Sequence, residues 1–309
     1  MANSSMALTT SKRALIFSLS YFPMVGGAEV AVREITGRTR DIEFDMVTLR
    51  FDKAHPKFER IGNINVYRIS GGLGYLSKIF FVPQAALFAL RQKYDFHWAI
   101  MTYMLFPAAI ARICGNAAPY ILTIQDGDPF SRVFSRWFIW IFKPLLVYGF
   151  RRAARVQAIS TFLAKWSGRG DAIVIPNGVD IERFLNPKSK ILNPDAVVLI
   201  TISRLVPKNG VNDIIEAMRY LPENIKLKII GSGPLEKSLK LKVTSLQLGN
   251  RVEFLGLIPY DKIHENLYGA DIFIRPSLSE GQGVAFIEAM AAGLPVIATP
   301  VGGIPDFLK

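Results

Sequence analysis

Short apolar stretches typical of buried strands alternate along the whole chain with longer segments of helical period. In the first half, the expected strands span residues 14–20, 44–49, 98–102, 120–123, 156–159 and 173–175, and the expected helices span 28–38, 76–93, 107–114 and 131–153. The cycle restarts at residue 197 and continues through 211–220, 226–230, 235–246, 251–254, 260–268 and 271–275. This alternation is the pattern of βαβ units, so the sequence predicts an α/β fold with parallel sheets.

A polar stretch that contains Pro and Asn, residues 186–195, interrupts the alternation and is interpreted as a linker. A chain of 309 residues is long enough to bury two separate cores. We therefore expect two Rossmann-like domains, an N-terminal domain over residues 1–185 and a C-terminal domain over residues 186–309.

The cysteine content and the length of the apolar stretches indicate in which cellular compartment such a chain functions. The single cysteine, Cys114, excludes an internal disulfide and favours a reducing compartment, so a cytoplasmic location is expected. The sequence contains no run of about 18 uncharged apolar residues, so a membrane-spanning helix is not expected. Lys12 and Arg13, followed by apolar residues 14–22, resemble a secretory signal, and the alternative is a first buried strand.

The formal net charge of +12 favours an anionic partner, either nucleic acid or a membrane surface. No nucleic-acid motif is recognised, so nucleic acid is not expected. Residues 130–155 interleave aromatic and basic side chains, which is typical of an interfacial amphipathic segment. The alternative is a core-facing helix with snorkelling basic ends. We expect peripheral contact with an anionic membrane surface, at the inner face of the cytoplasmic membrane.

Residues 279–290 carry the strongest chemical signal in the chain. Glu280 and Glu288 flank a glycine-containing turn, and the residues from 284 onward are predicted to form a helix directly after a buried strand, residues 272–274. The N-terminus of such a helix offers backbone N–H groups to a phosphate, and a carboxylate accepts two hydrogen bonds from a sugar diol. A nucleotide-sugar site is therefore predicted, whereas two glutamates on a solvated helix face is the alternative.

This segment resembles the donor-site signature of the retaining family-four glycosyltransferases, which have the GT-B fold, two Rossmann-like domains facing a cleft. The resemblance covers about residues 13–309 and includes residues 175–180, 203–210, 229–234 and 254–256. The family begins with a buried strand, which favours that interpretation of residues 14–20. In the family the phrase at residues 304–309 opens another helix, so the resemblance implies a truncated chain with an incomplete second domain.

The resemblance also implies roles for individual residues. Arg204 occupies the position of the family's diphosphate-binding Arg. The family usually has Lys five residues later, where this chain has Asn209, so Lys208 is either its substitute or a solvated loop lysine. Many relatives carry a His about where this chain has Gln125. Either Asp126 or Asp128 orients an acceptor hydroxyl, or both belong to an ordinary turn.

The first glutamate, Glu280, is expected near the transferred sugar and the second, Glu288, at the ribose. The donor-binding set is predicted to be Gly26, Gly27, Arg204, Lys208, Gly231, Gly233, Glu280, Gly281, Gly283, Val284 and Glu288, and the catalytic set Glu280, Arg204, Lys208 and Asp126. No metal and no cofactor are expected, because cations and backbone donors can stabilise a departing diphosphate.

The expected function is transfer, with retention of configuration, of a sugar from a nucleotide-diphosphate sugar to a glycan, lipid-linked or cell-envelope acceptor. Two other functions remain open from the sequence. One is a GT-B-fold nucleotide-sugar epimerase. The other is an inactive remnant that binds a nucleotide sugar without turnover.

Overall fold

The computed structural model describes residues 11–72, 74, 76–127, 137–184 and 196–309, and the chain divides into two compact units. The first unit is built mainly from residues up to 175 and the second mainly from residue 176 onward. The boundary between the two units therefore lies about ten residues before the boundary predicted at residue 185. The reason is that Val179 and Phe184 pack into the core of the second unit. The predicted linker lies outside the described residues.

In the described part of unit 1, one eight-stranded sheet has the order β3-β4-β2-β1-β5-β6-β7-β8, and all neighbouring strands are parallel except β3 and β4. The strands are β1 (Lys12–Phe17), β2 (Ile42–Leu49), β3 (Phe58–Ile61), β4 (Ile64–Ile69), β5 (Phe96–Ile100), β6 (Tyr120–Ile124), β7 (Arg155–Ala158) and β8 (Ile173–Val174). The helices are α1 (Gly27–Arg38), α2 (Leu76–Leu90), α3 (Leu105–Ile113) and α5 (Trp137–Arg152), with α6 (Thr161–Trp166) following β7.

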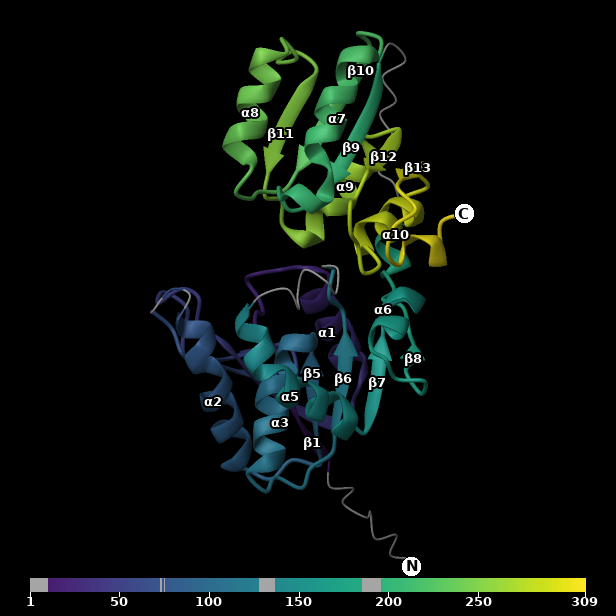
Figure 1. Ribbon diagram of the computed structural model, residues 1–309. Helices are drawn as coiled ribbons and strands as arrows, with labels where there is room; N and C mark the ends of the chain where they lie inside the picture. The colour runs from purple at the N-terminus through teal and green to yellow at the C-terminus, as the bar shows by residue number, and fades with distance from the viewer. Residues whose placement is uncertain (1–10, 73, 75, 128–136, 185–195) are drawn as a thin grey trace, which may run out of the picture. The chain divides into compact units, whose positions relative to one another are not determined.

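Helices cover both faces of this sheet. Ala14 and Ile16 of β1 join a core that includes residues of α1, whereas the alternate residues Leu15 and Phe17 are fully buried on the other face. Helices α2, α3 and α5 pack side by side in one layer (Figure 1). Burial on both faces is what a parallel sheet requires, because its crossover connections run over both sides.

Unit 2 contains a five-stranded parallel sheet in the order β11-β10-β9-β12-β13. The strands are β9 (Val197–Ile202), β10 (Ile225–Ile230), β11 (Val252–Gly256), β12 (Ile272–Arg275) and β13 (Val296–Ala298), and the helices are α7 (Val211–Ala217), α8 (Glu236–Ser245), α9 (Ile263–Tyr268) and α10 (Val284–Ala291). Leu199 of β9 packs in the core formed with α7 and α8. The next residue, Ile200, packs in the opposite core with Phe273 and Phe286. Unit 2 is therefore also a three-layer α/β structure.

The predicted α/β alternation is confirmed, and the predicted strand 197–202 coincides with β9. The hairpin β3–β4 and the short helix α6 were not predicted. The hairpin turns at Gly62, which has a left-handed φ of 60°. Its outer strand β3 alternates exposed and half-buried residues and contains no fully buried residue, so it lacks a clear apolar pattern. Residues 131–136 of the predicted helix lie outside the described residues. In the part of the chain that the structure describes, no helix has the length and hydrophobicity to cross a bilayer.

Candidate functional site

The site predicted from the signature lies at the edge of the unit 2 sheet where the strand order reverses. From β9 the chain first adds β10 and β11 on one side and later β12 and β13 on the other side. The loops that follow β9 and β12 therefore diverge at the carboxyl ends of adjacent strands, which is where open α/β sheets bind ligands. The first loop carries Arg204 and Lys208, and the second carries Glu280.

These two loops are in direct backbone contact. The N–H of Leu278 donates to the carbonyl oxygen of Lys208 at 2.7 Å. Gly210, which has a left-handed φ of 68°, lies so close to Pro276 that a Cβ there would be 2.1 Å from the Pro276 carbonyl oxygen. Arg204 is exposed and Lys208 is half-buried. The structure thus brings the predicted diphosphate-binding loop and the predicted sugar-binding loop together.

Asn209, at the position of the family's usual lysine, supports the loop. It is 6% exposed, and its Nδ2 donates to the carbonyl oxygen of Arg204 at 2.7 Å. An uncharged side chain buried in this way holds the backbone of Arg204 but brings no charge to a phosphate. The assignment of the second cation to Lys208 stays a prediction.

Gly231 and Gly233 let the turn after β10 lie against the Arg204 turn. A Cβ at Gly231 would be 1.9 Å from the Ser203 carbonyl oxygen, and one at Gly233 would be 2.5 Å from the Leu205 carbonyl oxygen. The N–H of Leu205 donates to the carbonyl oxygen of Ser232 at 2.9 Å. Packing alone therefore requires glycine at both positions, and their contact with a donor stays a prediction.

Glu280 lies in the loop before α10, as predicted, but its carboxylate has a partner that the sequence analysis missed. Arg275, the last residue of β12, is 6% exposed and forms an ion pair through Nη2 with Oε2 of Glu280. The other carboxylate oxygen, Oε1, accepts the N–H of Gly281 at 3.0 Å. A charged residue that ends an otherwise apolar strand, five residues before a predicted site carboxylate, is the signal that could have revealed Arg275.

The helix of the signature begins at Val284, after Gly283 with a left-handed φ of 84°. Glu288 is on its second turn and is 6% exposed. Burial raises the pKa of Glu288, whereas a hydrogen bond from Tyr260 and the charges of Arg183 and Arg275 act in the opposite direction. Glu288 is therefore not part of a solvated helix face, which was the alternative interpretation, and its contact with a ligand stays a prediction.

In unit 1 the strand order reverses between β1 and β5, and the predicted glycines follow β1. Helix α1 begins at Gly27, with Gly26 as its N-cap. The N–H of Gly26 donates to Oε2 of Glu29 at 2.9 Å, and the Ser20 hydroxyl donates to Oε1 of Glu29 at 2.6 Å. A phosphate that binds the N–H of Gly26 would have to displace the Glu29 carboxylate. The contact of Gly26 and Gly27 with the donor stays a prediction.

Asp126 follows β6 at the same edge of the unit 1 sheet. Its Oδ2 accepts the backbone N–H of Thr102 at 3.0 Å and the Thr102 hydroxyl at 2.8 Å. Gln125 before it is buried at 8% exposure. Thr102 therefore fixes the direction of the Asp126 carboxylate, which suits either a turn or an acceptor-orienting group. The other candidate, Asp128, lies outside the described residues.

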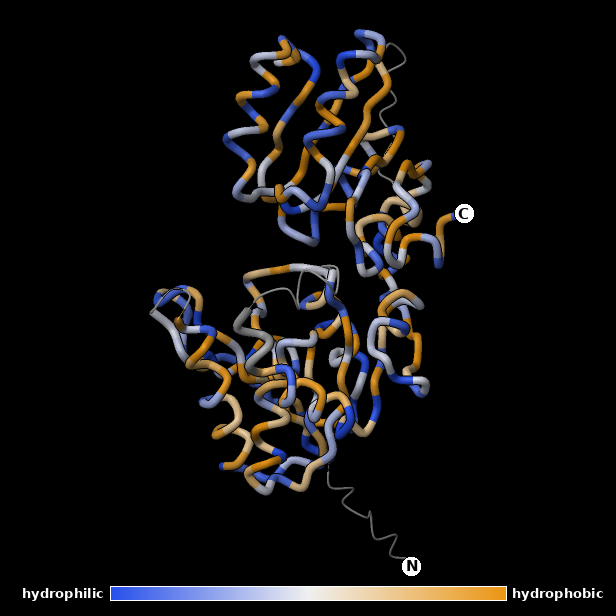
Figure 2. Tube along the Cα trace, in the orientation of Figure 1, coloured by the Kyte–Doolittle hydropathy of each residue, from blue (hydrophilic) through white to orange (hydrophobic). Residues whose placement is uncertain are grey.

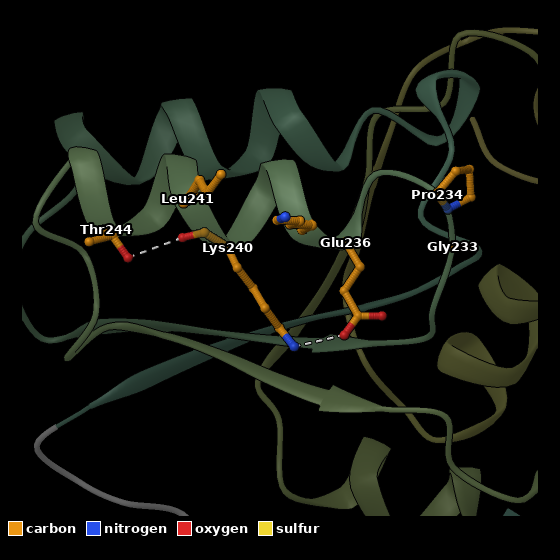
Figure 3. Close-up of a pocket in the computed structure, with 7 residues that line it drawn as sticks. Gly233, Pro234, Glu236, Lys240, Leu241 and Thr244 are labelled. Atoms are coloured by element: carbon orange, nitrogen blue, oxygen red, sulfur yellow. Dashed lines mark hydrogen bonds and ion pairs between the residues drawn. The ribbon is translucent and has the colours of Figure 1, made fainter.

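A shallow hollow runs along α8 in unit 2 (Figure 3). Its lining consists of Gly233, Pro234, Glu236, Lys237, Lys240, Leu241 and Thr244. Figure 3 shows Lys240 reaching Glu236, and their ion pair of 2.7 Å satisfies both charges. Gly233 is shared with the predicted donor set, but the two glutamates of the signature do not line this hollow.

Two families of glycosyltransferases match the chain, one in each half. Residues 25–183 match the family described as Glycosyltransferase Family 4, and residues 182–309 match Glycosyl transferases group 1. An uncharacterized glycosyltransferase of Methanocaldococcus jannaschii is 27% identical over 298 residues, which are 93% of this chain and 79% of that protein. The putative colanic acid biosynthesis glycosyltransferase WcaL of Escherichia coli is 33% identical over 219 residues, 65% of this chain, and the chain spans 52% of its length.

Solved structures with the same fold include HepE of Anabaena in complex with UDP and glucose, with a TM-score of 0.76 and 23% identity over 96% of this chain and 83% of that one. Sucrose-phosphate synthase of Thermosynechococcus elongatus gives a TM-score of 0.79 at 19% identity, over 96% of this chain and 84% of that one. These neighbours agree with the GT-B fold class. Because a Family 4 match covers residues 25–183 and a group 1 match covers the segment with the glutamate signature, this chain belongs to glycosyltransferase family 4.

Proposed function

We propose that this chain is a retaining, metal-independent glycosyltransferase of the cytoplasm. Its donor would be a nucleoside-diphosphate sugar and its acceptor a glycan or a lipid-linked precursor of the cell envelope. The observation that carries the proposal is the contact of two loops at the switch point of unit 2, one bearing Arg204 and Lys208 and the other Glu280. The relative WcaL is named for colanic acid biosynthesis, which supports an envelope acceptor.

Each group has a distinct task in this proposal. Arg204 offers a planar fork to the diphosphate, and Lys208 adds a second positive charge as negative charge develops on the leaving group. Glu288 accepts hydrogen bonds from the ribose, and Glu280 does so from the transferred sugar. The bond from the anomeric carbon to phosphate breaks while a bond to the acceptor oxygen forms on the same face. The acceptor proton passes to an oxygen of the departing diphosphate.

Calorimetry with a panel of nucleoside diphosphates and their sugar conjugates tests the proposal. The panel contains UDP, ADP and GDP, each alone and linked to glucose, in buffer that contains EDTA. We expect one nucleoside diphosphate and its conjugate to bind without added metal. Absence of binding by every member would overturn the function, and binding that returns only with manganese would overturn metal independence.

Replacing Arg204 with Ala is expected to weaken binding of the nucleoside diphosphate about tenfold or more, because a charge-assisted bond to phosphate is lost. Arg219→Ala is the matched control. It removes one positive charge from the same unit. Arg219 is exposed, forms an ion pair of 2.6 Å with Glu216, and precedes β10 in the chain, so it lies at the amino end of the strands and not at their carboxyl ends. Equal affinities for Arg204→Ala and the unmodified chain, with both folded, would remove Arg204 from the site.

In this proposal the chain also contacts an anionic membrane through the helical layer of unit 1. Helix α2 exposes a row of large apolar side chains, namely Leu76, Ile79, Phe80, Leu87 and Leu90. Figure 2 shows the tube of α2 coloured mostly as hydrophobic residues. On α5, Phe142 and Val147 are exposed together with Lys143 and Arg151. Apolar groups can enter the interface while basic groups stay near lipid headgroups.

Liposome sedimentation measures this contact. The double variant Ile79→Ser/Phe80→Ser is expected to lower the partition onto anionic vesicles about tenfold, because two apolar side chains no longer leave water. Leu241→Ser removes an equally exposed apolar residue from α8 in unit 2 and should change nothing. Partition that is equal on neutral and anionic vesicles would contradict the electrostatic part, and equal partition of both variants would contradict the role of α2.

A further inference from the structure

Arg275 is a cation enclosed within unit 2. Its Nε donates to the Ser277 hydroxyl at 3.2 Å, and its Nη1 donates to the carbonyl oxygen of Ile202 at 3.2 Å. The guanidinium carbon lies 4.2 Å from the centre of the Phe286 ring. Nη2 completes the set with the ion pair to Glu280. Every edge of the guanidinium therefore has a named contact, so its position is closely determined.

Stability by itself does not account for a charge at this place. Removing a guanidinium from water is costly, and apolar residues of similar volume often replace a buried ion pair without loss of stability. The three residues that precede Arg275 in β12, Ile272 to Ile274, show that this strand accepts apolar side chains. The effect of Arg275 on its partner Glu280 is therefore a more direct reason for a cation at this position.

The ion pair fixes the Glu280 carboxylate without exhausting it. Oε2 meets Arg275 and Oε1 accepts the Gly281 N–H, whereas a carboxylate has about four acceptor positions. The Glu280 side chain also keeps 16% of its surface exposed. Two bonds from different directions set the plane of the carboxylate and leave acceptor capacity for hydroxyl groups.

The glycines of the signature independently point to the same arrangement. A Cβ at Gly283 would be 2.6 Å from Arg275 Nη2 and 2.5 Å from the Phe286 ring. Glycine at this position therefore provides the space in which the guanidinium lies. The carbonyl oxygen of Glu280 accepts the N–H of Gly303 at 3.1 Å, so the backbone of Glu280 is held as well as its side chain.

We infer that Arg275 is a positioning residue that aims the Glu280 carboxylate at the hydroxyl groups of the donor sugar and thereby sets how strongly the sugar part of the donor is bound. Arg275 acts through Glu280 and does not contact the sugar. The inference rests on the proposed function of this site. It implies that losing Arg275 weakens recognition of the sugar and, at a pH at which Glu288 is ionised, spares recognition of the nucleoside diphosphate.

Calorimetry on the full chain tests this with UDP and UDP-glucose, or with the pair that the nucleotide panel identifies. The variants are Glu280→Gln, Arg275→Gln, their double variant and Arg275→Lys. At a pH at which Glu288 is ionised, Arg275→Gln should weaken binding of the sugar conjugate about tenfold, the loss expected for one charge-assisted bond, and change binding of the nucleoside diphosphate less than twofold. The double variant should bind the conjugate no more weakly than Glu280→Gln alone, because both changes remove one interaction. Arg275→Lys should recover part of the loss.

Ser277→Ala is the milder second variant if Arg275→Gln does not fold. It removes one bond of the guanidinium and leaves the ion pair intact, so it should weaken only the conjugate, about threefold. Equal losses for both ligands would make Arg275 a purely structural residue and overturn the inference. Additive losses in the double variant would also overturn it. If Glu280→Gln itself has no effect, the assigned role of Glu280 fails, and if the unmodified chain binds neither ligand, the proposed function fails.

Discussion

Gly302→Ala is expected to destabilise unit 2 by about 2–5 kcal/mol, the largest loss of stability that we predict for a single substitution. Gly302 has a φ of 60°, and a Cβ there would be 1.8 Å from the carbonyl oxygen of Glu280. The variant must adopt a left-handed conformation and also push the Glu280 backbone away. Urea denaturation followed by circular dichroism measures the free energy of unfolding.

Gly293→Ala is the matched control, because Gly293 has a similar φ of 75° but nothing lies within 4 Å of the position that a Cβ would take there. This variant should lose only the free energy of the left-handed conformation, about 1–2 kcal/mol. The difference between the two variants isolates the close approach to Glu280. Equal losses of unfolding free energy for the two variants would show that the close approach of Gly302 to the Glu280 carbonyl oxygen adds no cost.

Glu288→Gln is expected to weaken binding of the nucleoside diphosphate about tenfold or more, because a carboxylate that accepts two hydrogen bonds is replaced by a weaker acceptor. Glu280→Gln should leave that binding unchanged and weaken the sugar conjugate, or lower turnover where the interaction forms chiefly in the transition state. Calorimetry with each ligand separates the two. Identical patterns for both variants would contradict the division into ribose and sugar contacts.

The pH dependence gives a second measurement on Glu288. Since burial raises its pKa, the carboxyl binds a proton more tightly in the folded chain than in the unfolded chain. Its contribution to stability is therefore present at low pH and lost as pH rises through the raised pKa. Nucleoside diphosphate affinity should rise over the same range, because the ionised form accepts both ribose hydrogen bonds. Glu288→Gln should remove this step in affinity, whereas Glu280→Gln should keep it.

At a pH above its raised pKa, Glu288 is ionised at some cost in folding free energy. Glu288→Gln mimics the neutral carboxyl and should unfold at the same or higher urea concentration at neutral pH, while it binds the nucleotide more weakly. A variant that loses both stability and affinity would indicate instead that Glu288 chiefly supports the fold.

Much of the fold followed from local patterns. Strand β9, with apolar residues that face both cores, and helix α10, which begins after a glycine, were predicted within a residue because their signals are contiguous. Strand β3 was missed because a strand at the sheet edge need not be apolar, whereas β4 next to it does alternate buried and half-buried residues and was overlooked. The boundary between units shifted because burial of Phe184, and not chain composition, decides to which core a segment belongs.

The sequence by itself determined the α/β class, and it located the glutamate pair and Arg204 as candidate site residues, since each rests on residues adjacent in the chain or at a fixed spacing. Only the tertiary structure decided that Arg275 lies against Glu280, that Asn209 braces the Arg204 turn, and that Glu29 occupies the N–H of Gly26. These contacts depend on the direction in which each side chain leaves its backbone and on how neighbouring loops pack. Spacing along a chain specifies neither of them. A change in the backbone dihedral angles of one residue reorients its side chain, while the sequence motif stays the same.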